Sequence, residues 1–589
     1  MASQSPRYCM SDQRPNIDFL YRITNDVLWN TFRKNEIGDV MLPFVVLRRL
    51  DCILEPQKAA VRAAYEQFKD KVAPDRLGPI LMKAAGPENK LKFYNHSAYD
   101  LRKLAEDPGN VEMNFRNYVN GFSANVQDIL ENYQLDKVVV RLVKNGLLYQ
   151  LVQAISRVDL HLSAVSNHDM GYVFEELIRI ANEQSNETAG EHFTPREVIK
   201  LLASIIFSTE KEELRDPTHI RTIYDLACGT GGMLTQSKLF IAEELGGKAE
   251  VRIFGQEINE QSYAIAKSDL LITGEDPNNI RHGNSFTEDR FPGAKFNYML
   301  ANPPYGVSWK RDELYLKHEA LNPEGRFAAG LPRSSDGQFL FIQHLISKME
   351  DPAQGGSRIG IVTNGSPLFT GDAGSGESEI RRWIIQNDWL EAVVALPSEI
   401  FFNTGIFTYL WILSNKKPAK RQGKVQLIDA REQWVPMKKS LNNKRKKISE
   451  EQIKTVTDLY TAFEEGPLVK IFPNDFFGYY QVVVEQPEYD AKGKAVLDKK
   501  TGRPKPDKKK RDYENIPLSE NIQAYLEREV KPHVPEAFLD MSQTRIGYEI
   551  NFTKYFYQYQ QPESSQNLKA QILELERNID GLLHEILAD

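Results

Sequence analysis

The feature that most constrains the fold is an alternation of apolar, β-prone runs with amphipathic segments between Asp169 and Lys417. The apolar runs read RTIYDLA, EVRIFGQE, KFNYMLA, SRIGIVT, LEAVVAL and FTYLWILS. Such runs are typical of strands that are buried on both faces, and the segments between them supply crossover helices. The pattern predicts an α/β domain with a mostly parallel sheet and helices on both faces.

The rest of the chain divides into three further parts. Its 589 residues exceed one ordinary core. Apolar spacings of three and four, as in IDFLYRITNDVLWNTF, predict a helical N-terminal domain over residues 1–160, ahead of the α/β domain over 161–480. The stretch KGKAVLDKKTGRPKPDKKKRD has almost no large apolar residues, which predicts a basic flexible insert over 481–515. Residues 516–589 form a predicted C-terminal region that closes with a helix.

Composition excludes several classes of protein. Hydrophobic content of 41% and charged content of 26% are typical of a soluble globular protein, and no apolar run approaches a membrane span. The N-terminus lacks the apolar segment of a signal peptide. Three scattered cysteines without CxxC spacing argue against a disulfide framework or a metal site and favour the cytoplasm. A net charge of −7 means that any affinity for DNA must come from a local patch or a partner.

The first chemical motif is the segment IYDLACGTGGML. An apolar strand leads to Asp225, and a turn with Gly229, Gly231 and Gly232 leads into an apolar helix. Glycines let backbone amides approach a ligand closely, but NAD, FAD and S-adenosylmethionine proteins all use such a turn. The next strand ends at Glu257, where a carboxylate can accept the ribose hydroxyls of an adenosine ligand. An ordinary surface carboxylate is the alternative.

The second motif is LANPPYG, which follows a further apolar strand and so belongs at the same carboxyl edge of the sheet. Asn302 and the backbone carbonyl of Pro303 can accept the N–H bonds of an exocyclic amine and turn its lone pair toward a methyl donor. Pro304 stiffens the loop, and Tyr305 offers a flat face on which a flipped base can stack. A plain proline-stiffened loop is the alternative for an isolated match.

Taken together, these motifs resemble those of amino-methylating, S-adenosylmethionine-dependent methyltransferases, whose fourth motif is [DNS]PP[YFW]. The segment AGEHFTPREVIKLLA narrows the resemblance to the methyltransferase (M) subunits of type I restriction–modification systems. Locally, Thr194 is expected to cap a helix that has Pro195 in its first turn, with Glu197 completing a capping box. The segments IGDVMLPFVVLRRLD, MGYVFEELIRIANE and IGYEINFTKYFY also resemble those subunits, so the likeness covers most of the chain.

The resemblance implies a Rossmann-like methyltransferase domain between a helical N-terminal domain and a helical C-terminal tail. It implies an enzyme that transfers a methyl group from S-adenosyl-L-methionine to the N6 of a flipped adenine in double-stranded DNA, with Asn302, Pro303, Pro304 and Tyr305 as the catalytic residues. It also implies a specificity (S) subunit, with two M subunits for each S, and a restriction (R) subunit as partners. The implied cofactor-binding residues are Glu191, His192, Phe193, Thr194, Pro195, Arg196, Asp225, Gly229, Thr230, Gly231, Gly232 and Glu257.

Alternatives remain open from the residues. The Asn-Pro-Pro-Tyr motif does not separate adenine N6 from cytosine N4, and it also serves methyltransferases that modify protein glutamine. A non-catalytic scaffold that binds the cofactor is a further alternative. Asn284 in HGNSF is a candidate for the cofactor adenine, and an ordinary asparagine turn explains it equally well.

The chain closes with apolar residues at alternating spacings of four and three, the a/d seam of a coiled coil. We expect this seam either to dock the helices of a specificity subunit or to pack on its own domain. Its members are Leu568, Ile572, Leu575, Ile579, Leu582 and Ile586.

Overall fold

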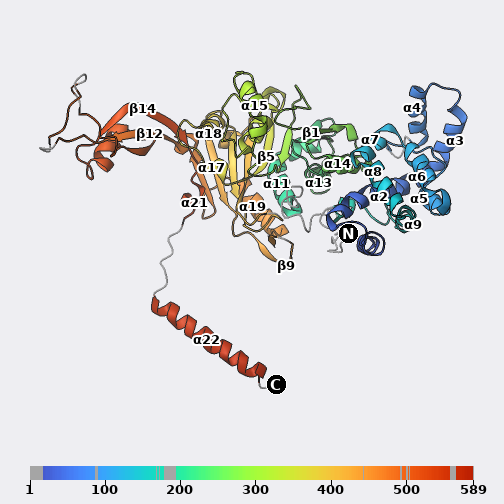
Figure 1. The fold of residues 1–589 in the computed structure, drawn as a ribbon. Helices are drawn as coiled ribbons and strands as arrows, with labels where there is room; N and C mark the ends of the chain where they lie inside the picture. Colours follow the sequence, from blue (N-terminus) through green and yellow to red (C-terminus); the bar gives the residue numbers. More distant parts are fainter. Residues whose placement is uncertain are drawn as a thin grey trace, which may run out of the picture. The chain divides into compact units, whose positions relative to one another are not determined.

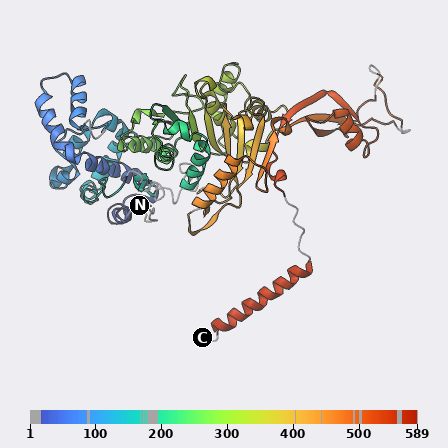
Figure 2. The same ribbon diagram turned by 180° about the vertical axis from the view of Figure 1, so that it is seen from behind.

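A computed structural model of the chain shows how these segments are arranged (Figure 1, Figure 2). Two compact units divide it, residues 1–550 and 551–589. The structure describes residues 17–86, 91–166, 169–171, 173–174, 176–177, 194–402, 404–441, 443–490, 494–498, 502, 504–557 and 565–587.

The N-terminal region is helical, as predicted. Its helices are α1 (Asp18–Ile23), α2 (Lys34–Leu54), α3 (Lys58–Phe68), α4 (Pro74–Ala84), α5 (Leu101–Leu104), α6 (Val111–Asn120), α7 (Ala124–Asn132), α8 (Leu135–Lys144) and α9 (Leu148–Ser156). Helix α2 lies at the centre, because nearly all its side chains from Val40 onward are buried. Its Asp51 accepts hydrogen bonds from the amide of Leu101 (2.8 Å) and the hydroxyl of Tyr118 (2.9 Å), which ties α5 and α6 to it.

The α/β region is built on a nine-stranded sheet in the order β11-β8-β6-β7-β5-β4-β1-β2-β3. All strands run parallel except β7 and β11, which confirms the predicted mostly parallel sheet. The strands are β1 (Ile220–Asp225), β2 (Glu250–Glu257), β3 (Ile280–His282), β4 (Tyr298–Ala301), β5 (Arg358–Asn364), β6 (Leu390–Ala395), β7 (Thr408–Ser414), β8 (Lys424–Asp429) and β11 (Val469–Pro473).

Side chains as well as backbone hold β1 and β4 together. Asn297, which precedes β4, accepts hydrogen bonds at Oδ1 from the amide (3.1 Å) and the hydroxyl (3.2 Å) of Thr222. The Thr222 hydroxyl accepts in return from the amide of Asn297 (3.0 Å). This pairing fixes β4, and with it the loop that follows β4, against β1.

Helices cover the sheet. They are α11 (Arg196–Phe207), α12 (Lys211–Arg215), α13 (Gly232–Glu243), α14 (Glu260–Ile272), α15 (Glu313–Ala320), α16 (Gln338–Ser347), α17 (Ser366–Phe369), α18 (Gly376–Gln386) and α19 (Glu450–Ala462). Helix α14 serves two cores, because Ala264, Ile265 and Leu271 pack among the N-terminal helices while Ala266 and Leu270 pack with the sheet. It therefore joins the helical region to the α/β region.

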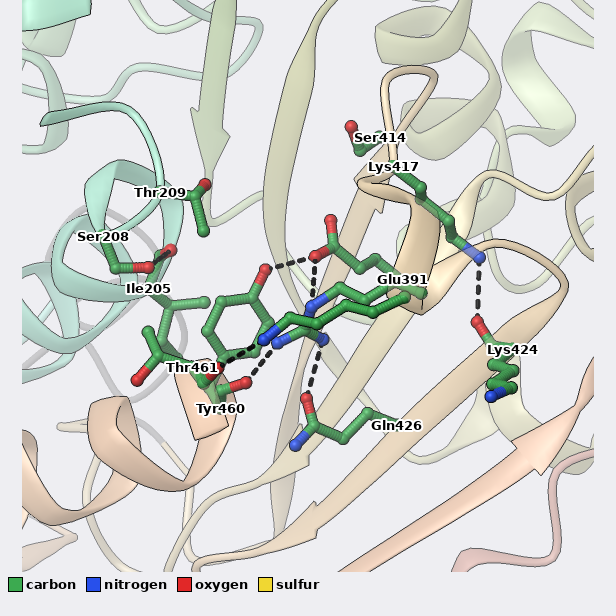
Figure 3. Close-up of polar contacts among 12 residues, drawn as sticks. Ile205, Ser208, Thr209, Glu391, Ser414, Lys417, Lys424, Gln426, Tyr460 and Thr461 are labelled. Carbon is green, nitrogen blue, oxygen red and sulfur yellow. Dashed lines mark hydrogen bonds and ion pairs between the residues drawn. The ribbon is translucent and has the colours of Figure 1, made fainter. Parts of the chain in front are cut away.

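A buried charge cluster joins the sheet to α11 and α19 (Figure 3). The guanidinium of Arg358 donates to Glu391 Oε2 (3.1 Å) and to the carbonyl of Ile206 (3.0 Å), and the Tyr460 hydroxyl donates to Glu391 Oε1 (2.6 Å). Arg421 lies 3.2 Å from the same carboxylate. Burial alone would raise the pKa of Glu391, but the two guanidinium groups outweigh it and hold that pKa below its ordinary value.

A three-stranded antiparallel sheet follows, in the order β13-β12-β14. Its strands are β12 (Gly478–Glu485), β13 (Asp512–Pro517) and β14 (Phe538–Tyr548), with the short helix α20 (Ile522–Tyr525) between the last two. The predicted boundaries at 480 and 515 both fall inside strands of this sheet, so the ends of the expected flexible insert are wrong. Paired strands flank the insert, because β12 is the central strand and forms hydrogen bonds with both β13 and β14.

A separate hairpin pairs β9 (Val435–Leu441) with β10 (Lys444–Lys447). The C-terminal unit contains α21 (Phe552–Tyr555) and α22 (Ser565–Leu587). Along α22 the apolar side chains at Leu568, Ile572, Leu575 and Ile579 are 47–60% exposed.

Within the described residues, no single helix meets the length and hydropathy of a membrane span, and one sharply bent pair, α8 with α9, meets them only jointly.

Candidate functional site

A pocket lies where β1 and β4 end and α11 and α13 begin. Its walls are Gly171, Phe174, Thr194, Arg196, Ile199, Asp225, Ala227, Cys228, Gly229, Thr230, Gly232, Met233, Thr235, Gln236, Ile265, Asp269 and Asn302. The structure therefore brings together residues from three sequence motifs that are far apart along the chain.

The glycine turn forms the floor of the pocket. Gly229 and Gly231 both have positive φ, 54° and 85° respectively, a region that glycine occupies without strain. Gly231 is the N-cap of α13, and its amide donates to the carbonyl of Cys228 (2.8 Å). A Cβ at Gly231 would lie 3.4 Å from that of Ala266 on α14, an ordinary contact, so it is the backbone conformation that restricts this position.

Glu257 stands at the end of β2 as predicted, but its carboxylate is occupied by backbone. Oε2 accepts from the amide of Gly229 (2.8 Å) and Oε1 from the amide of Asn259 (2.7 Å). The side chain is 6% exposed, and burial raises its pKa despite these hydrogen bonds. Through these hydrogen bonds Glu257 shapes the glycine turn, and it is not part of the pocket wall. Its assignment to the ribose stays a prediction.

Asp225 is the acidic group of the pocket wall. Its Oδ1 accepts from the amide of Ala227 (3.0 Å), and the side chain is otherwise buried. Burial, together with the negative charge of nearby Glu257, raises the pKa of Asp225 to about 8. A carboxyl held in this way is stabilised as an anion only when a cationic group enters the pocket.

The Asn-Pro-Pro-Tyr motif adjoins the pocket through Asn302. Asn302 Nδ2 donates to the hydroxyl of Thr194 (2.9 Å), and Asn302 Oδ1 accepts from the hydroxyl of Tyr305 (2.8 Å). Burial raises the pKa of Tyr305, which keeps the phenol protonated as this donor. The ring of Tyr305 meets the ring of Phe401 edge to face, with centroids 6.3 Å apart. The Asn302 oxygen thus faces the space beside Tyr305, while its nitrogen faces the pocket wall.

The expected capping box at Thr194 is wrong. Helix α11 begins at Arg196 with Pro195 as its N-cap, and no side chain caps it. The Thr194 hydroxyl bonds Asn302 instead, and Glu197 forms an ion pair with Lys444 of β10. A tertiary contact has taken both side chains away from the local helix signal.

Several other predicted residues lie elsewhere. Asn284 accepts from the amide of Phe286 (2.9 Å) and donates to Asp312 (3.1 Å), away from the pocket wall, so the asparagine turn describes its contacts. Glu191, His192 and Phe193 lie outside the described residues.

Sequence reasoning missed a set of wall residues on helices. Asp269 and Ile265 come from α14, and Thr235 and Gln236 from α13. The one available signal was the presence of polar residues inside otherwise apolar helices, which does not by itself separate a pocket wall from a buried hydrogen bond.

The fold and the site define a Rossmann-like α/β domain with a glycine-turn pocket beside an Asn-Pro-Pro-Tyr loop. Residues 165–485 match the N-6 DNA Methylase family, and residues 18–155 match the HsdM N-terminal domain. Because the first match covers more than half of the chain, the chain belongs to the N-6 DNA methylase family. The predicted fold class and family are thereby confirmed.

Related proteins agree with this membership. The type I restriction enzyme MjaIX methylase subunit of Methanocaldococcus jannaschii is 27% identical over 50% of this chain and 49% of its own length. The type I restriction enzyme HindI methylase subunit of Haemophilus influenzae is 30% identical over 45% of this chain and 54% of its own length. The chain thus spans about half the length of the curated relatives it matches. A type I restriction–modification methyltransferase subunit from Streptococcus thermophilus shares the fold, with TM-score 0.60 and 21% identity over 78% of this chain and 96% of that one.

Proposed function

We propose that this chain transfers a methyl group from S-adenosyl-L-methionine to the exocyclic N6 of adenine in DNA, as the modification subunit of a type I restriction–modification complex. The observation that carries the proposal is the double position of Asn302. It belongs to the wall of the glycine-turn pocket, and it also opens the Asn-Pro-Pro-Tyr loop. A methyl donor on one side and an amine on the other would meet at this residue.

The pocket fits S-adenosylmethionine by the chemistry of its walls. The glycine turn presents backbone to a ligand without side-chain obstruction, and Asp225 is a carboxyl suited to a cationic group. When bound, the cofactor supplies a methyl group on a good leaving group. Thr194, Arg196, Asp225, Gly229 and Thr230 are the wall residues that we assign to holding it.

The target base is assigned to the other side of Asn302. Its Oδ1 and the carbonyl of Pro303 accept the two N–H bonds of the amine, which frees the nitrogen lone pair for attack. The ring of Tyr305, backed by Phe401, stacks on the base that has left the duplex. Positioning and the placement of acceptors carry the catalysis, so no strongly basic side chain is required before transfer.

Partners complete the proposal. The net charge of −7 does not favour binding to DNA by the whole surface, so recognition is assigned to a specificity subunit, with two copies of this chain for each copy of it. A restriction subunit joins the same complex. The exposed apolar residues of α22 are the docking surface that we assign to the specificity subunit.

The test is transfer of a labelled methyl group by the purified chain with its specificity subunit, followed by nucleoside analysis of the DNA. We expect N6-methyladenine, and we expect the Asn302→Ala variant to form it about two to three orders of magnitude more slowly. N4-methylcytosine in the digest would move the activity to the other exocyclic amine. Label on protein glutamine would replace DNA as substrate, and cofactor binding without any transfer would identify a scaffold.

A further inference from the structure

The β9–β10 hairpin carries a concentration of positive charge that the site description does not use. Residues 435–447 read VPMKKSLNNKRKK, with six lysines and arginines and no aspartate or glutamate, in a chain whose net charge is −7. Two antiparallel strands carry these residues, and β9 lies close to α19 in Figure 1. The positive charges of this segment repel one another, and an anionic partner would offset that repulsion.

The hairpin is fastened to the loop that supports the target-base site. The amide of Arg445 donates to the carbonyl of Glu399 (2.9 Å), and the amide of Asn443 donates to that of Phe402 (3.2 Å). Phe401, the residue before Phe402 in that loop, packs its ring against the ring of Tyr305. Glu399 has a positive φ of 57°, a conformation that costs energy in a residue with a side chain. The loop therefore holds the hairpin and Tyr305 in a fixed relation.

A second connection runs to the cofactor pocket. Lys444 is buried, forms an ion pair with Glu197 on the first turn of α11, and donates to the carbonyl of Ile400 (2.8 Å). Glu197 lies one residue after Arg196, which is a wall residue of the pocket. This inward-facing lysine therefore anchors the hairpin.

Three other cations of the hairpin are open to solvent. Lys438, Arg445 and Lys447 are exposed, and the Arg445 side chain is 68% exposed. Among the described residues, Lys438 and Lys447 form no ion pair, and Arg445 has a loose one to Glu399 at 3.7 Å. Pairs of that kind contribute little, so these charges are available to an outside anion. Lys446 lies over the ring of Trp434, with its Nζ 4.2 Å from the centroid.

We propose that the β9–β10 hairpin binds the sugar–phosphate backbone of the duplex next to the flipped base. This inference rests on the proposed function, because it takes DNA as the substrate. A base that has swung out to Tyr305 leaves its flanking phosphates within a short reach of that ring, and the hairpin is the basic element tied to the loop behind it. Lysine and arginine side chains that neutralise phosphates supply affinity without reading sequence.

The experiment measures how the affinity for a fluorescein-labelled DNA duplex depends on salt. The variant Lys438→Gln/Arg445→Gln/Lys447→Gln is compared with the full-length wild-type chain. Loss of three phosphate contacts should reduce the magnitude of the slope of log K against log salt by about 2.7. The charge-conserving variant Lys438→Arg/Arg445→Lys/Lys447→Arg should keep the wild-type slope. A distant control, Lys69→Gln/Lys71→Gln/Arg76→Gln on the exposed α3–α4 region, removes equal charge and should leave the slope unchanged.

Calorimetry with S-adenosylmethionine and thermal unfolding on the same variants separate the outcomes. We expect both to match the wild type, because the three side chains are exposed. An unchanged salt slope in the Gln variant, with wild-type DNA binding intact, overturns the hairpin assignment and leaves the proposed function standing. Loss of the specificity subunit from the Gln variant with an unchanged slope would instead make the hairpin a protein contact and also overturn it. A wild-type chain that binds no duplex, alone or with its specificity subunit, removes the proposed function itself.

Discussion

The hydroxyl of Tyr305 donates a 2.8 Å hydrogen bond to Oδ1 of Asn302, the atom assigned to the target amine. The phenol therefore occupies this acceptor and satisfies a polar atom that would otherwise lack a partner. The incoming amine must take this place. Exchange of one hydrogen bond for another keeps the energetic cost of opening the site low.

Substitutions at this pair should separate the two roles. Asn302→Ala should lower the rate of methyl transfer by about two to three orders of magnitude, as expected when an acceptor for the reacting group is lost. Tyr305→Phe removes only the placeholder hydroxyl, worth about 0.5–1.5 kcal/mol, and should change the rate by no more than about tenfold. Tyr305→Ala should weaken capture of the base by about 1–3 kcal/mol through lost stacking.

Single-turnover transfer and cofactor calorimetry measure these effects. Cofactor affinity should stay within a few-fold in all three variants, which controls for folding. A defect in Tyr305→Phe as large as that in Tyr305→Ala would show that the hydroxyl, and not the ring, is what the base needs.

Asp225 should make cofactor binding depend on pH. Its pKa is raised to about 8, so near neutral pH most of it is protonated. A cationic ligand favours the anion and lowers that pKa, so binding releases a proton and affinity should rise with pH until about 8, then level off. Asp225→Asn should abolish this dependence. Calorimetry in buffers of different ionisation enthalpy counts the proton directly, and a pH-independent affinity in the wild type would contradict the assignment.

Glu391 should be needed for stability and not for chemistry. Glu391→Gln leaves Arg358 and Arg421 buried without their anion, which should cost about 3–5 kcal/mol in the free energy of unfolding. The exposed pair of Glu379 with Arg382 is the control, since Glu379→Gln should cost less than about 1 kcal/mol. Denaturant unfolding measures both.

Glu391 should also affect how the free energy of unfolding depends on pH. The pKa of Glu391 in the folded state is held below its ordinary value. Its contribution to the free energy of unfolding is therefore fully present above the pKa of the unfolded state, and it is lost as the pH falls through the pKa of the folded state. The acid limb of wild-type stability should therefore flatten in Glu391→Gln. An equally steep limb in the variant would assign acid sensitivity to other carboxylates.

The C-terminal helix should be dispensable for folding and required for assembly. Residues 1–550 form a compact unit without it, and the described seam residues of α22 are about half exposed. Deletion of residues 567–589 should leave cofactor binding and thermal unfolding unchanged, yet abolish co-purification with the specificity subunit and transfer to DNA. Replacement of Lys569 and Glu576 by alanine keeps the apolar seam and is the matched control. An unfolded truncation would make the helix internal packing, and a truncation that still assembles would end the docking proposal.

The sequence predicted the parts of the fold that follow from local pattern. All six quoted apolar runs form strands of the large sheet, because β-branched and aromatic residues are favoured in buried strands. It missed β3, β8 and β11, in which charged residues break the apolar pattern, and of these β3 and β11 are the edge strands of the sheet. The cap assigned to Thr194 failed because Asn302, more than a hundred residues away, takes the hydroxyl. Asp269 in the pocket wall could not be predicted, since only the packing of α14 brings it there.

Glu257 shows the same limit in a different way. An acidic residue at the tip of the second strand was correctly placed, but its hydrogen bonds go to the amides of Gly229 and Asn259. Spacing along a chain gives the position of a side chain, and only the folded backbone decides which donor reaches it first.

The hydrogen bond from Asn302 to Thr194 gives the two halves of the site a common wall. Ligands on opposite sides of a shared side chain are thermodynamically linked, and the linkage is reciprocal. Whatever factor the methyl donor adds to the affinity for an extruded base, the base must add to the affinity for the donor. After the proposed transfer both ligands are products. Where each ligand raises the affinity for the other, release of one product weakens binding of the second, and the product that first breaks its contact with Asn302 leaves first.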